Sequence, residues 1–593
     1  MMRPHILLFL CLILASPANA QQITDDYSPE SGDSVIADKH TKHLPLNNFN
    51  AIGTTKPAKQ FIVSSANPLA SQTAYDVLNK GGNAIDAMVA IQTVLGLVEP
   101  QSSGLGGGAF LVYYDAKSKR ISTYDGRETA PIKAPDNLFM TKDATPMQFF
   151  DAVVGGRSVG TPGTVKLLWE IHQTHGSKLW SELLSPAISL ANKGFMVSPR
   201  LANAIKNDET RLTHDKASAE YFFPEGLALR SGETLRNPEY AETLSLLSQH
   251  GGDYFYRSEI SHAIVSKVQS AKNQGYLSQA DFDQYAIKER KPTCSSYRQF
   301  EVCGMGPPSS GAITVNQTLG ILSNFNLATR SPDKAETWQL IAEASRLSFA
   351  DRGLYIADPD FVQLPKGLLA PEYLKQRASL IKAGKASQKI QAGTPDHHLA
   401  KQFSLGRSPE QASTSHFVIV DKAGNIVSMT STIENGFGSR LMVKGFLLNN
   451  ELTDFSFKSE QNGKFIANRV TPGKRPRSSM APTIVLKNNK PYLALGSPGG
   501  SSIITYVANA LIAILDWKMP IQKAFNLPHI INRFGKMELE AHTPATKHAQ
   551  AFSDMGYQVS KKGLNSGLHG VLFTPQGMLG AADKRREGLV LGL

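Results

Sequence analysis

The pattern of apolar residues changes at Thr414, and this change constrains the fold of the chain more than any other feature. From about Thr164 to Leu399 the apolar residues recur mainly with helical spacing. After Thr414 the chain instead forms hairpin patterns at 417–432 and 483–495, followed by an apolar helical run from about Ser501 to Trp517. Helical stretches beside antiparallel hairpins predict a layered α/β fold in which helices flank stacked antiparallel sheets.

Capping residues predict the first ordered elements of the chain. A strand is expected at 61–65, and Asn67 followed by a proline marks the start of a helix that runs to Lys80 and stops at two glycines. A second helix is expected from about Ala84 to Val98. Its apolar residues are too many for one stripe, so it should be buried on most sides. A hairpin is expected at 109–124.

Met1 to Ala20 have the pattern of a secretory signal. Arg3 provides the charged region, Ile6 to Leu14 form the apolar core, and a small-x-small site ends at Ala20. The apolar core is too short to span a membrane. We therefore expect cleavage after Ala20, a periplasmic or secreted protein without stable membrane insertion, and a flexible N-terminal segment over 21–59. An uncleaved leader that tethers the protein to the inner membrane is the alternative.

Charge and cysteine content argue against several functions. The formal charge of +12 is modest for 593 residues, and no basic run is interleaved with aromatic residues, so we expect no nucleic acid partner. Outside the leader the chain has two cysteines, Cys294 and Cys303, and without a histidine cluster they do not make a metal site. An exported protein permits a disulfide between them, but spacing alone does not prove one.

The glycine run from Gly104 to Ala109 fits the dinucleotide fingerprint G-x-G-x-x-A, with Asp125 at the distance expected of a ribose ligand. That fingerprint must follow a strand and open a helix. Here a predicted helix precedes the run and a predicted strand follows it. We interpret the run instead as a loop that lets the backbone approach a buried site.

The segment from Gly156 to Gly160 fits the nucleophile elbow G-x-S-x-G around Ser158. The preceding run, 148–154, has a composition compatible with a strand, so the local context does not exclude an elbow. A hydrolase of that type also needs an acid and a histidine downstream. No histidine there has distinguishing neighbours, and we interpret Ser158 as a residue of a structural turn.

Thr414 has the properties of a latent nucleophile. The hydroxyl of an internal threonine lacks a base, but cleavage of the Ser413–Thr414 bond would create an α-amine with a pKa of about 7.7–8.0, which can accept the hydroxyl proton. Thr432 ends the next strand of the same hairpin, so the two hydroxyls are expected to be neighbours. Gly499 and Gly500 precede the apolar helix, and their N–H groups suit an oxyanion formed during acyl transfer.

Together with motifs in the first half of the chain, these segments resemble the γ-glutamyltransferase (glutathione hydrolase) family of N-terminal nucleophile hydrolases. The resemblance extends from about Phe61 to the C-terminus. The motifs of the first half that carry it are Ser65–Ala70, Gly81–Ala87, Gly104–Gly108, Asp125–Pro131 and Pro307–Gly311.

The resemblance implies a four-layer αββα sandwich and a precursor that cleaves itself before Thr414. The products would be a large fragment, 60–413 with its N-terminal segment, and a small fragment, 414–593, which remain together as a heterodimer. Thr414 would be the nucleophile, Thr432 would orient it, and Gly499 and Gly500 would form the oxyanion hole. The resemblance implies no metal and no organic cofactor.

The resemblance also implies a γ-glutamyl donor such as glutathione, with water, an amino acid or a peptide as acceptor. Arg127 would pair with the α-carboxylate of the γ-glutamyl group, helped by the hydroxyls of Ser478 and Ser479. The α-ammonium group would be held by three acids, of which the last two are expected in a loop after a strand: Glu434, Glu451 and Asp454. His416 resembles a general base, but the terminal amine does that work in the family.

Two departures from the family pattern concern the ammonium pocket and the access of water. Glu434 occupies a position where some bacterial members have asparagine, so the pocket is more acidic, and 456–474 matches the lid loop only loosely and lacks a covering tyrosine, which leaves the balance of hydrolysis and transpeptidation open. Two alternatives to a γ-glutamyltransferase also stay open. One is a cephalosporin or glutaryl acylase of the same fold, and the other is an exported binding protein that does not cleave itself.

Overall fold

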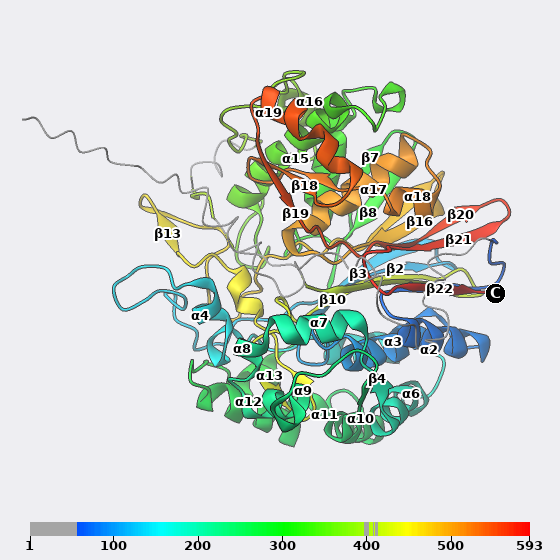
Figure 1. Ribbon diagram of the computed structural model, residues 1–593, viewed down its shortest axis with the longest axis vertical. Helices are drawn as coiled ribbons and strands as arrows, with labels where there is room; N and C mark the ends of the chain where they lie inside the picture. The colour runs from blue at the N-terminus through cyan, green and yellow to red at the C-terminus, as the bar shows by residue number, and fades with distance from the viewer. Residues whose placement is uncertain (1–55, 396–401, 407, 409–412) are drawn as a thin grey trace, which may run out of the picture.

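The computed structural model describes residues 56–395, 402–406, 408 and 413–593, in which two antiparallel sheets are stacked on each other (Figure 1). The signal sequence with its cut after Ala20 lies outside the described residues. At the end of the segment predicted to be flexible, the amides of Ala58 and Lys59 donate to the carbonyl oxygens of Met578 and Leu593, which ties this point of the chain to the C-terminal strands.

The two sheets contain seven and six strands. The seven-stranded sheet has the order β22 (Leu589–Gly592), β1 (Ile62–Ser65), β9 (Ser415–Val420), β10 (Ile426–Thr432), β2 (Gly108–Asp115), β3 (Arg120–Gly126) and β6 (Lys288–Arg290). The six-stranded sheet has the order β21 (Gly577–Ala582), β20 (His569–Thr574), β16 (Lys490–Gly496), β15 (Thr483–Lys487), β8 (Phe300–Gly304) and β7 (Thr293–Tyr297). Both hairpins predicted after Thr414 are confirmed.

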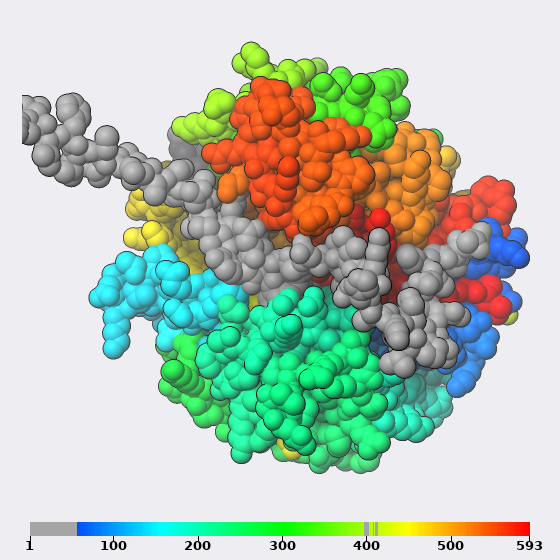
Figure 2. Space-filling view, in the orientation of Figure 1, coloured from blue at the N-terminus to red at the C-terminus, as the bar shows by residue number. Residues whose placement is uncertain are grey.

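Helices cover the outer face of each sheet (Figure 1). The seven-stranded sheet is covered by α2 (Pro68–Asn79), α3 (Ala84–Val98), α5 (Thr164–His175), α6 (Trp180–Lys193) and helices packed behind them, among them α7 (Pro199–Asn207), α10 (Pro238–His250) and α12 (Glu259–Ser270). The six-stranded sheet is covered by α14 (Gly311–Leu322), α15 (Ala335–Tyr355), α17 (Ile503–Leu515) and α18 (Ile521–Phe525). Figure 2 shows α7 to α10 on the lower half of the surface and α19 (Ala549–Asp554) on the upper half.

Alternate residues of a central strand reach different parts of the core. On β2, Phe110 and Val112 lie in the core between the sheets, whereas Leu111 and Tyr113 lie in the core under the helices. A strand that is buried on both faces is apolar along its whole length, which explains the continuous apolar run in the sequence. The helix predicted at 84–98 is confirmed, and all its residues are buried.

The structure excludes one alternative that the sequence left open, the elbow at Ser158, and contradicts one predicted strand. The run 148–154 contains a short helix, α4 (Phe149–Val153), and Gly156–Ser158 forms a turn of 3-10 helix. The Ser158 hydroxyl donates to the carbonyl oxygen of Val153 at 2.6 Å, so Ser158 is a turn residue and not an exposed nucleophile on a strand–helix elbow. The strand expected before Glu451 and Asp454 is also reduced to two residues, and the acids lie in a 3-10 helix, η5 (Glu451–Asp454).

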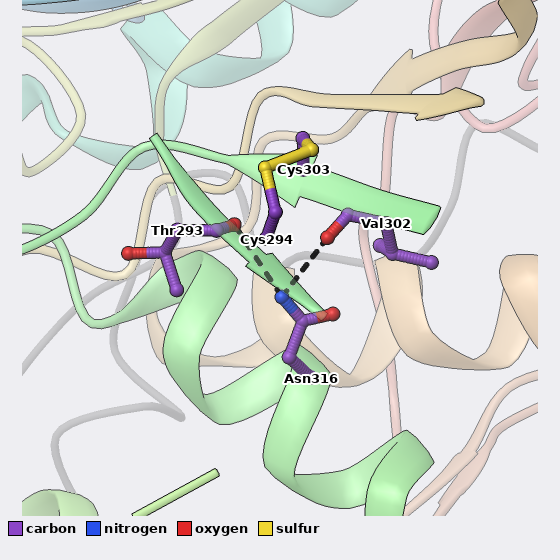
Figure 3. Close-up of a disulfide and its surroundings, with 5 residues drawn as sticks. All are labelled: Thr293, Cys294, Val302, Cys303 and Asn316. Atoms are coloured by element: carbon purple, nitrogen blue, oxygen red, sulfur yellow. Dashed lines mark hydrogen bonds between the residues drawn. A yellow bond between two sulfur atoms is a disulfide. The ribbon is translucent and has the colours of Figure 1, made fainter. Parts of the chain in front are cut away.

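Cys294 and Cys303 form a disulfide across the β7–β8 hairpin (Figure 3). The two residues are direct partners in the strand register, and their Cα atoms are 4.1 Å apart. The Asn316 side chain of α14 donates to the carbonyl oxygen of Val302 beside this bond. The spacing of the cysteines left open whether they form a disulfide, and in the structure they do. Sulfur atoms bonded to each other offer no thiolate to a metal ion.

No helix among the described residues combines the length and the apolar character needed to cross a membrane.

Candidate active site

The hairpin register places the hydroxyls of Thr414 and Thr432 side by side. Thr414 immediately precedes β9, and Ser415 pairs with Ser431 at the end of β10. The Thr414 hydroxyl donates to Thr432 Oγ1 at 3.1 Å, and Thr432 Oγ1 also accepts from the amide of Glu434 at 2.9 Å. The sheet therefore fixes the neighbouring hydroxyls that the sequence predicts.

Hydrogen bonds hold the carbonyl groups of Ser413 and Thr414, on both sides of the predicted cleavage site. The Ser413 carbonyl oxygen accepts from the Gly499 amide at 3.3 Å, and the Thr414 carbonyl oxygen accepts from Arg586 Nη1 at 3.1 Å. Thr414 has a φ of 107°, a conformation that a β-branched residue rarely adopts and that costs on the order of 1–3 kcal/mol. The bond between Ser413 and Thr414 therefore has a strained residue, Thr414, with its own hydroxyl, and a carbonyl oxygen that accepts a hydrogen bond from the Gly499 amide.

Gly499 and Gly500 form the turn that leads into α17. Their φ angles are 132° and 57°, and a Cβ atom on Gly499 would lie 2.7 Å from the ring of Tyr506. A short 3-10 turn, η6 (Gly500–Ser502), connects them to the N-terminus of α17, whose dipole favours negative charge nearby. The turn thus needs glycine, and it presents an N–H donor to a carbonyl oxygen that would become negative during attack.

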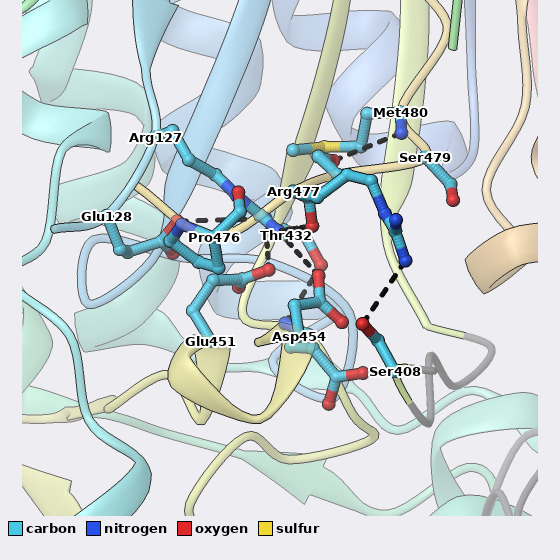
Figure 4. A network of polar contacts seen from close by, with 12 residues as sticks. Arg127, Glu128, Ser408, Thr432, Glu451, Asp454, Pro476, Arg477, Ser479 and Met480 are labelled. Atoms are coloured by element: carbon cyan, nitrogen blue, oxygen red, sulfur yellow. Dashed lines mark hydrogen bonds and ion pairs between the residues drawn. The ribbon is translucent and has the colours of Figure 1, made fainter. Parts of the chain in front are cut away.

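Arg127 lies in the loop after β3 with its side chain fully buried (Figure 4). Its guanidinium donates to Glu451 through Nη1 and to Asp454 Oδ2 at 2.5 Å through Nη2. It also donates to the carbonyl oxygens of Pro476 and Arg477, at 3.2 and 3.0 Å. In the uncleaved chain, Arg127 therefore pairs with two of the acids that the sequence assigns to a substrate ammonium group.

Nine of the ten site residues predicted from the sequence line one small cavity. Its lining residues are Arg127, Thr414, Thr432, Glu434, Glu451, Asp454, Ser478, Ser479, Met480, Gly500 and Ile503. The tenth, Gly499, donates its amide to the carbonyl oxygen of Ser413, the residue before Thr414. The free volume is about 20 Å³, which is room for about one water molecule. A ligand larger than a water molecule does not fit in this arrangement of the lining side chains.

The glycine loop before β2 packs directly behind this cavity. A Cβ atom on Gly107 would lie 2.0 Å from the carbonyl oxygen of Thr432, and one on Gly108 would lie 2.3 Å from Glu128 Oε2. The loop follows α3 and leads into a strand, which is the reverse of a dinucleotide site. Asp125 accepts from Arg290 Nε at 2.7 Å inside the protein. The glycines therefore allow close packing around Thr432 and Glu128.

Glu128 is a residue of this site that the sequence did not reveal. Its side chain is fully buried, and among the described residues neither of its carboxyl oxygens has a hydrogen-bond partner. Burial raises the pKa of Glu128 to about 7, although Arg127 Nη1, 3.9 Å away, opposes this rise. Burial likewise raises the pKa of Glu451, which interacts with Glu128. One proton shared between the carboxyl groups of Glu128 and Glu451 would give each of them a hydrogen bond. No pattern in the sequence indicates that these two carboxyl groups are neighbours.

We expect Glu128 to make stability depend on pH. Folded Glu128 binds its proton more tightly than an ordinary glutamate of pKa 4.5, so its contribution is full below about pH 4.5 and is lost as pH rises through about 7. Relative to Glu128→Gln, the free energy of unfolding should fall by about 3 kcal/mol between pH 4.5 and 7.5. Urea denaturation of both proteins in an uncleavable Thr414→Ala background measures this. An exposed control, Glu289→Gln, should keep the wild-type pH dependence, and equal curves for Glu128→Gln and wild type would contradict the prediction.

His416 is buried in the sheet, and its ring packs against neighbouring residues. Its Nδ1 lies 2.8 Å from Thr430 Oγ1, and a Cβ atom on Gly496 would lie 2.3 Å from the ring. Burial lowers the pKa of His416 well below its usual range, so the imidazole is neutral near pH 7. This packing gives no support to a general base role, in agreement with the sequence interpretation.

The segment that loosely matches the lid loop forms an exposed hairpin of β13 (Glu460–Gln461) and β14 (Lys464–Phe465). The described part of the chain before Thr414 contacts this segment. The Ser404 amide donates to the carbonyl oxygen of Phe465 at 2.9 Å, and Asn468 donates to Ser408 Oγ at 3.0 Å. The hairpin thus contacts the segment that precedes the predicted cleavage site.

Known proteins match most of the length of this chain. A family model described as Gamma-glutamyltranspeptidase matches residues 70–593. The chain is 36% identical over 561 residues to a glutathione hydrolase proenzyme of Bacillus subtilis (strain 168), which covers 93% of this chain and 94% of that protein. It is 33% identical over 549 residues to the Acylase ACY 1 proenzyme of Pseudomonas sp. (strain SE83), with coverages of 90% and 94%. The crystal structure of cephalosporin acylase from Bacillus halodurans matches with a TM-score of 0.80 and 25% identity, over 94% of this chain and 99% of that chain.

Proposed function

The chain belongs to the gamma-glutamyltranspeptidase family of enzymes, and we propose that it is an exported precursor that cleaves itself before Thr414 and then transfers γ-glutamyl groups. The fold is proposed to be the four-layer αββα sandwich of the N-terminal nucleophile hydrolases. The mature protein would begin at Gln21 in the periplasm or outside the cell. Its two fragments, 21–413 and 414–593, would stay together through the shared sheet, because β9 and β10 pair with strands of the large fragment on both sides.

The observation that carries the proposal is the arrangement at the Ser413–Thr414 bond. The Thr414 hydroxyl would attack the Ser413 carbonyl carbon while Gly499 N–H stabilises the oxyanion. The C–N bond would then break, the amine of Thr414 would take a proton, and Ser413 would become an ester of the Thr414 hydroxyl. Water would hydrolyse the ester to a Ser413 carboxylate and a free Thr414. Relief of the strained φ of Thr414 would favour the first step.

In the mature protein the Thr414 amine would accept the proton of its own hydroxyl, which attacks the γ-amide carbon of the donor. The amine leaving group of the donor takes that proton, and a γ-glutamyl ester of Thr414 remains. Water, or the amine of an amino acid or peptide, then releases the γ-glutamyl group. We propose that Arg127 holds the α-carboxylate with Ser478 and Ser479, and that acids of the same cavity hold the α-ammonium: Glu434, Glu451 and Asp454.

Acylase activity is the second candidate, because relatives and solved structures with acylase names match as much of the chain. The four buried acids around one arginine argue for a substrate with an ammonium group. A glutaryl group keeps the carboxylate but lacks the α-ammonium, so it would leave these acids without a cationic ligand. A binding protein that does not cleave itself is the third candidate, and it would not turn over either substrate.

The choice between the first two candidates is tested with two anilides. We expect kcat/KM for γ-glutamyl-4-nitroanilide to exceed that for glutaryl-4-nitroanilide by about 10³-fold or more, because a site built to bind an ammonium group rejects an analogue that lacks it. Release of 4-nitroaniline measures both rates. A matched variant, Asp454→Asn, should reduce this ratio by weakening ammonium binding. Equal or faster cleavage of the glutaryl compound would make the acylase the correct assignment.

A further inference from the structure

The loop that follows α3 contacts the chain on both sides of the predicted cleavage residue. Before Thr414, the Ser413 hydroxyl donates to the carbonyl oxygen of Gln101 at 2.7 Å. After Thr414, the Ser415 hydroxyl donates to Glu99 Oε2 at 3.1 Å. One loop of the large fragment therefore holds the side chains of both neighbours of the proposed nucleophile.

The loop after α3 is itself fixed by helix α7. Arg200 Nη1 of this helix pairs with Glu99 Oε1 at 3.1 Å, and Arg200 Nη2 donates to Ser102 Oγ at 3.1 Å. All three side chains are buried. The carbonyl oxygen of Gln101 also accepts from the amide of Phe437 at 3.1 Å. Because breaking one side of a buried ion pair leaves a charge uncompensated, the carboxylate of Glu99 has a fixed position.

The residue between the two contacts carries the backbone strain. Thr414 has a φ of 107°, and such a conformation persists only where the surrounding structure fixes it. Hydrogen bonds from Gly499 and Arg586 hold the two carbonyl oxygens described above. The loop after α3 adds a hold on the side chains of Ser413 and Ser415. Loss of such a side-chain contact should therefore let the backbone of Thr414 relax before its hydroxyl attacks.

We propose that Glu99 is a positioning residue for self-cleavage, which holds Ser415 so that Thr414 keeps the conformation from which its hydroxyl attacks. The inference rests on the proposed function, because it concerns cleavage of the same bond. Arg200 acts behind Glu99 by fixing its carboxylate. Glu99 takes no part in the bond changes, in which the Thr414 oxygen forms the ester with Ser413 as the C–N bond breaks. Its effect belongs to that step, because the strain of Thr414 is relieved there.

Loss of the Glu99 carboxylate should slow cleavage. We expect the full-length chain of Glu99→Ala to disappear about 5- to 100-fold more slowly than that of wild type, a range that follows from the cost of such a conformation. Glu99→Gln keeps an oxygen that accepts from the Ser415 hydroxyl, so it should be cleaved at least about 3-fold faster than Glu99→Ala. Chains made by cell-free synthesis and sampled over time on denaturing gels measure these rates.

A double-mutant cycle determines whether Glu99 acts through Ser415. Ser415→Ala removes the same hydrogen bond from its other end, so it should slow cleavage too. The double variant Glu99→Ala/Ser415→Ala should be cleaved at the rate of Glu99→Ala, within about 2-fold, because the second change has no contact left to remove. If the two effects multiply, Glu99 acts on the fold and not through Ser415, and the proposal is overturned.

Asp86→Ala is the matched control at the opposite end of α3. Asp86 is also a buried acid, and it accepts from the amide of Asn83 and the hydroxyl of Ser177, away from the cleavage site. In an uncleavable Thr414→Ala background, Asp86→Ala and Glu99→Ala should both lower the melting temperature. In the cleavable chain, Asp86→Ala should change the rate of cleavage less than about 2-fold. Equal slowing by both would mean that lost stability explains the effect, which overturns the proposal.

Hydroxylamine identifies the step at which Glu99 acts. Its nitrogen attacks the carbonyl carbon of an ester between Ser413 and Thr414, which leaves a hydroxamate on Ser413 and frees the Thr414 hydroxyl. Glu99→Ala should stay slow in its presence, because the ester itself forms slowly. Acceleration to the wild-type rate would place the effect in hydrolysis of the ester and overturn the proposal.

The same gels separate this inference from the proposed function. If wild type stays uncleaved, the proposed function fails. If wild type is cleaved and Glu99→Ala is cleaved equally fast, only the role of Glu99 fails.

Discussion

Thr414→Ala is expected to remain a single full-length chain without activity, while the wild-type protein separates into two bands on a denaturing gel. The substitution removes the hydroxyl that would attack the Ser413 carbonyl and later the donor amide, so one change abolishes both reactions. The loss of γ-glutamyl anilide hydrolysis should be at least about 10⁴-fold, as for other nucleophile deletions. Intact masses of the wild-type fragments should correspond to 21–413 and 414–593, which also tests the predicted cut after Ala20.

Thr414→Ser is the matched control for this prediction. Serine keeps the hydroxyl beside Thr432 and removes only a methyl group, so the chain should still be cut and should retain measurable activity. Thr432→Ala removes the partner hydroxyl and should slow cleavage without abolishing it. Cleavage of Thr414→Ala at the same bond, or a wild-type chain that stays intact, would falsify the role of Thr414.

Local signals in the sequence were sufficient for many elements of the fold. Asn67 accepts from the Leu69 amide as a helix N-cap, and the helix at 84–98 begins at a capping box of Asn83 and Asp86. At 148–154 the sequence left strand or helix open, because a short apolar run has no periodicity that separates the two. The strand prediction before Glu451 failed, because that segment takes its shape from packing against distant parts of the chain.

The candidate site was predictable as a set of residues but not as a network. Nine of the ten predicted residues line one cavity, because each belongs to a motif whose chemistry is visible in the sequence. The pairing of Arg127 with Glu451 spans 324 positions, and no local pattern indicates that the arginine and the acids satisfy each other in the uncleaved chain. Glu128 and Arg586 were missed for the same reason, since burial and long-range contacts alone give them their roles.

Arg127→Lys is expected to process normally and to lose most of its transferase and hydrolase activity. The cleavage machinery at Thr414 and Gly499 makes no hydrogen bond to Arg127 among the described contacts, so two bands should still form. Lysine keeps the charge but lacks the planar fork that binds a carboxylate through two N–H groups. We expect kcat/KM for γ-glutamyl-4-nitroanilide to fall about 10²- to 10³-fold, because a buried charge-assisted pair is lost from substrate binding and orientation.

Two comparisons determine whether that loss arises from the α-carboxylate. Arg290, on the neighbouring strand β6, is another arginine that pairs with an aspartate, Asp125, but it does not line the cavity. Arg290→Lys should therefore change kcat/KM less than about 3-fold. Slow cleavage of 4-aminobutyryl-4-nitroanilide, which keeps the ammonium group but has no α-carboxylate, should be nearly insensitive to Arg127→Lys. The substitution should therefore reduce the selectivity between the two anilides as well as the rate. An equal loss with both anilides would mean that Arg127 only supports the fold of the site, since its ion pairs with Glu451 and Asp454 would then be its whole function.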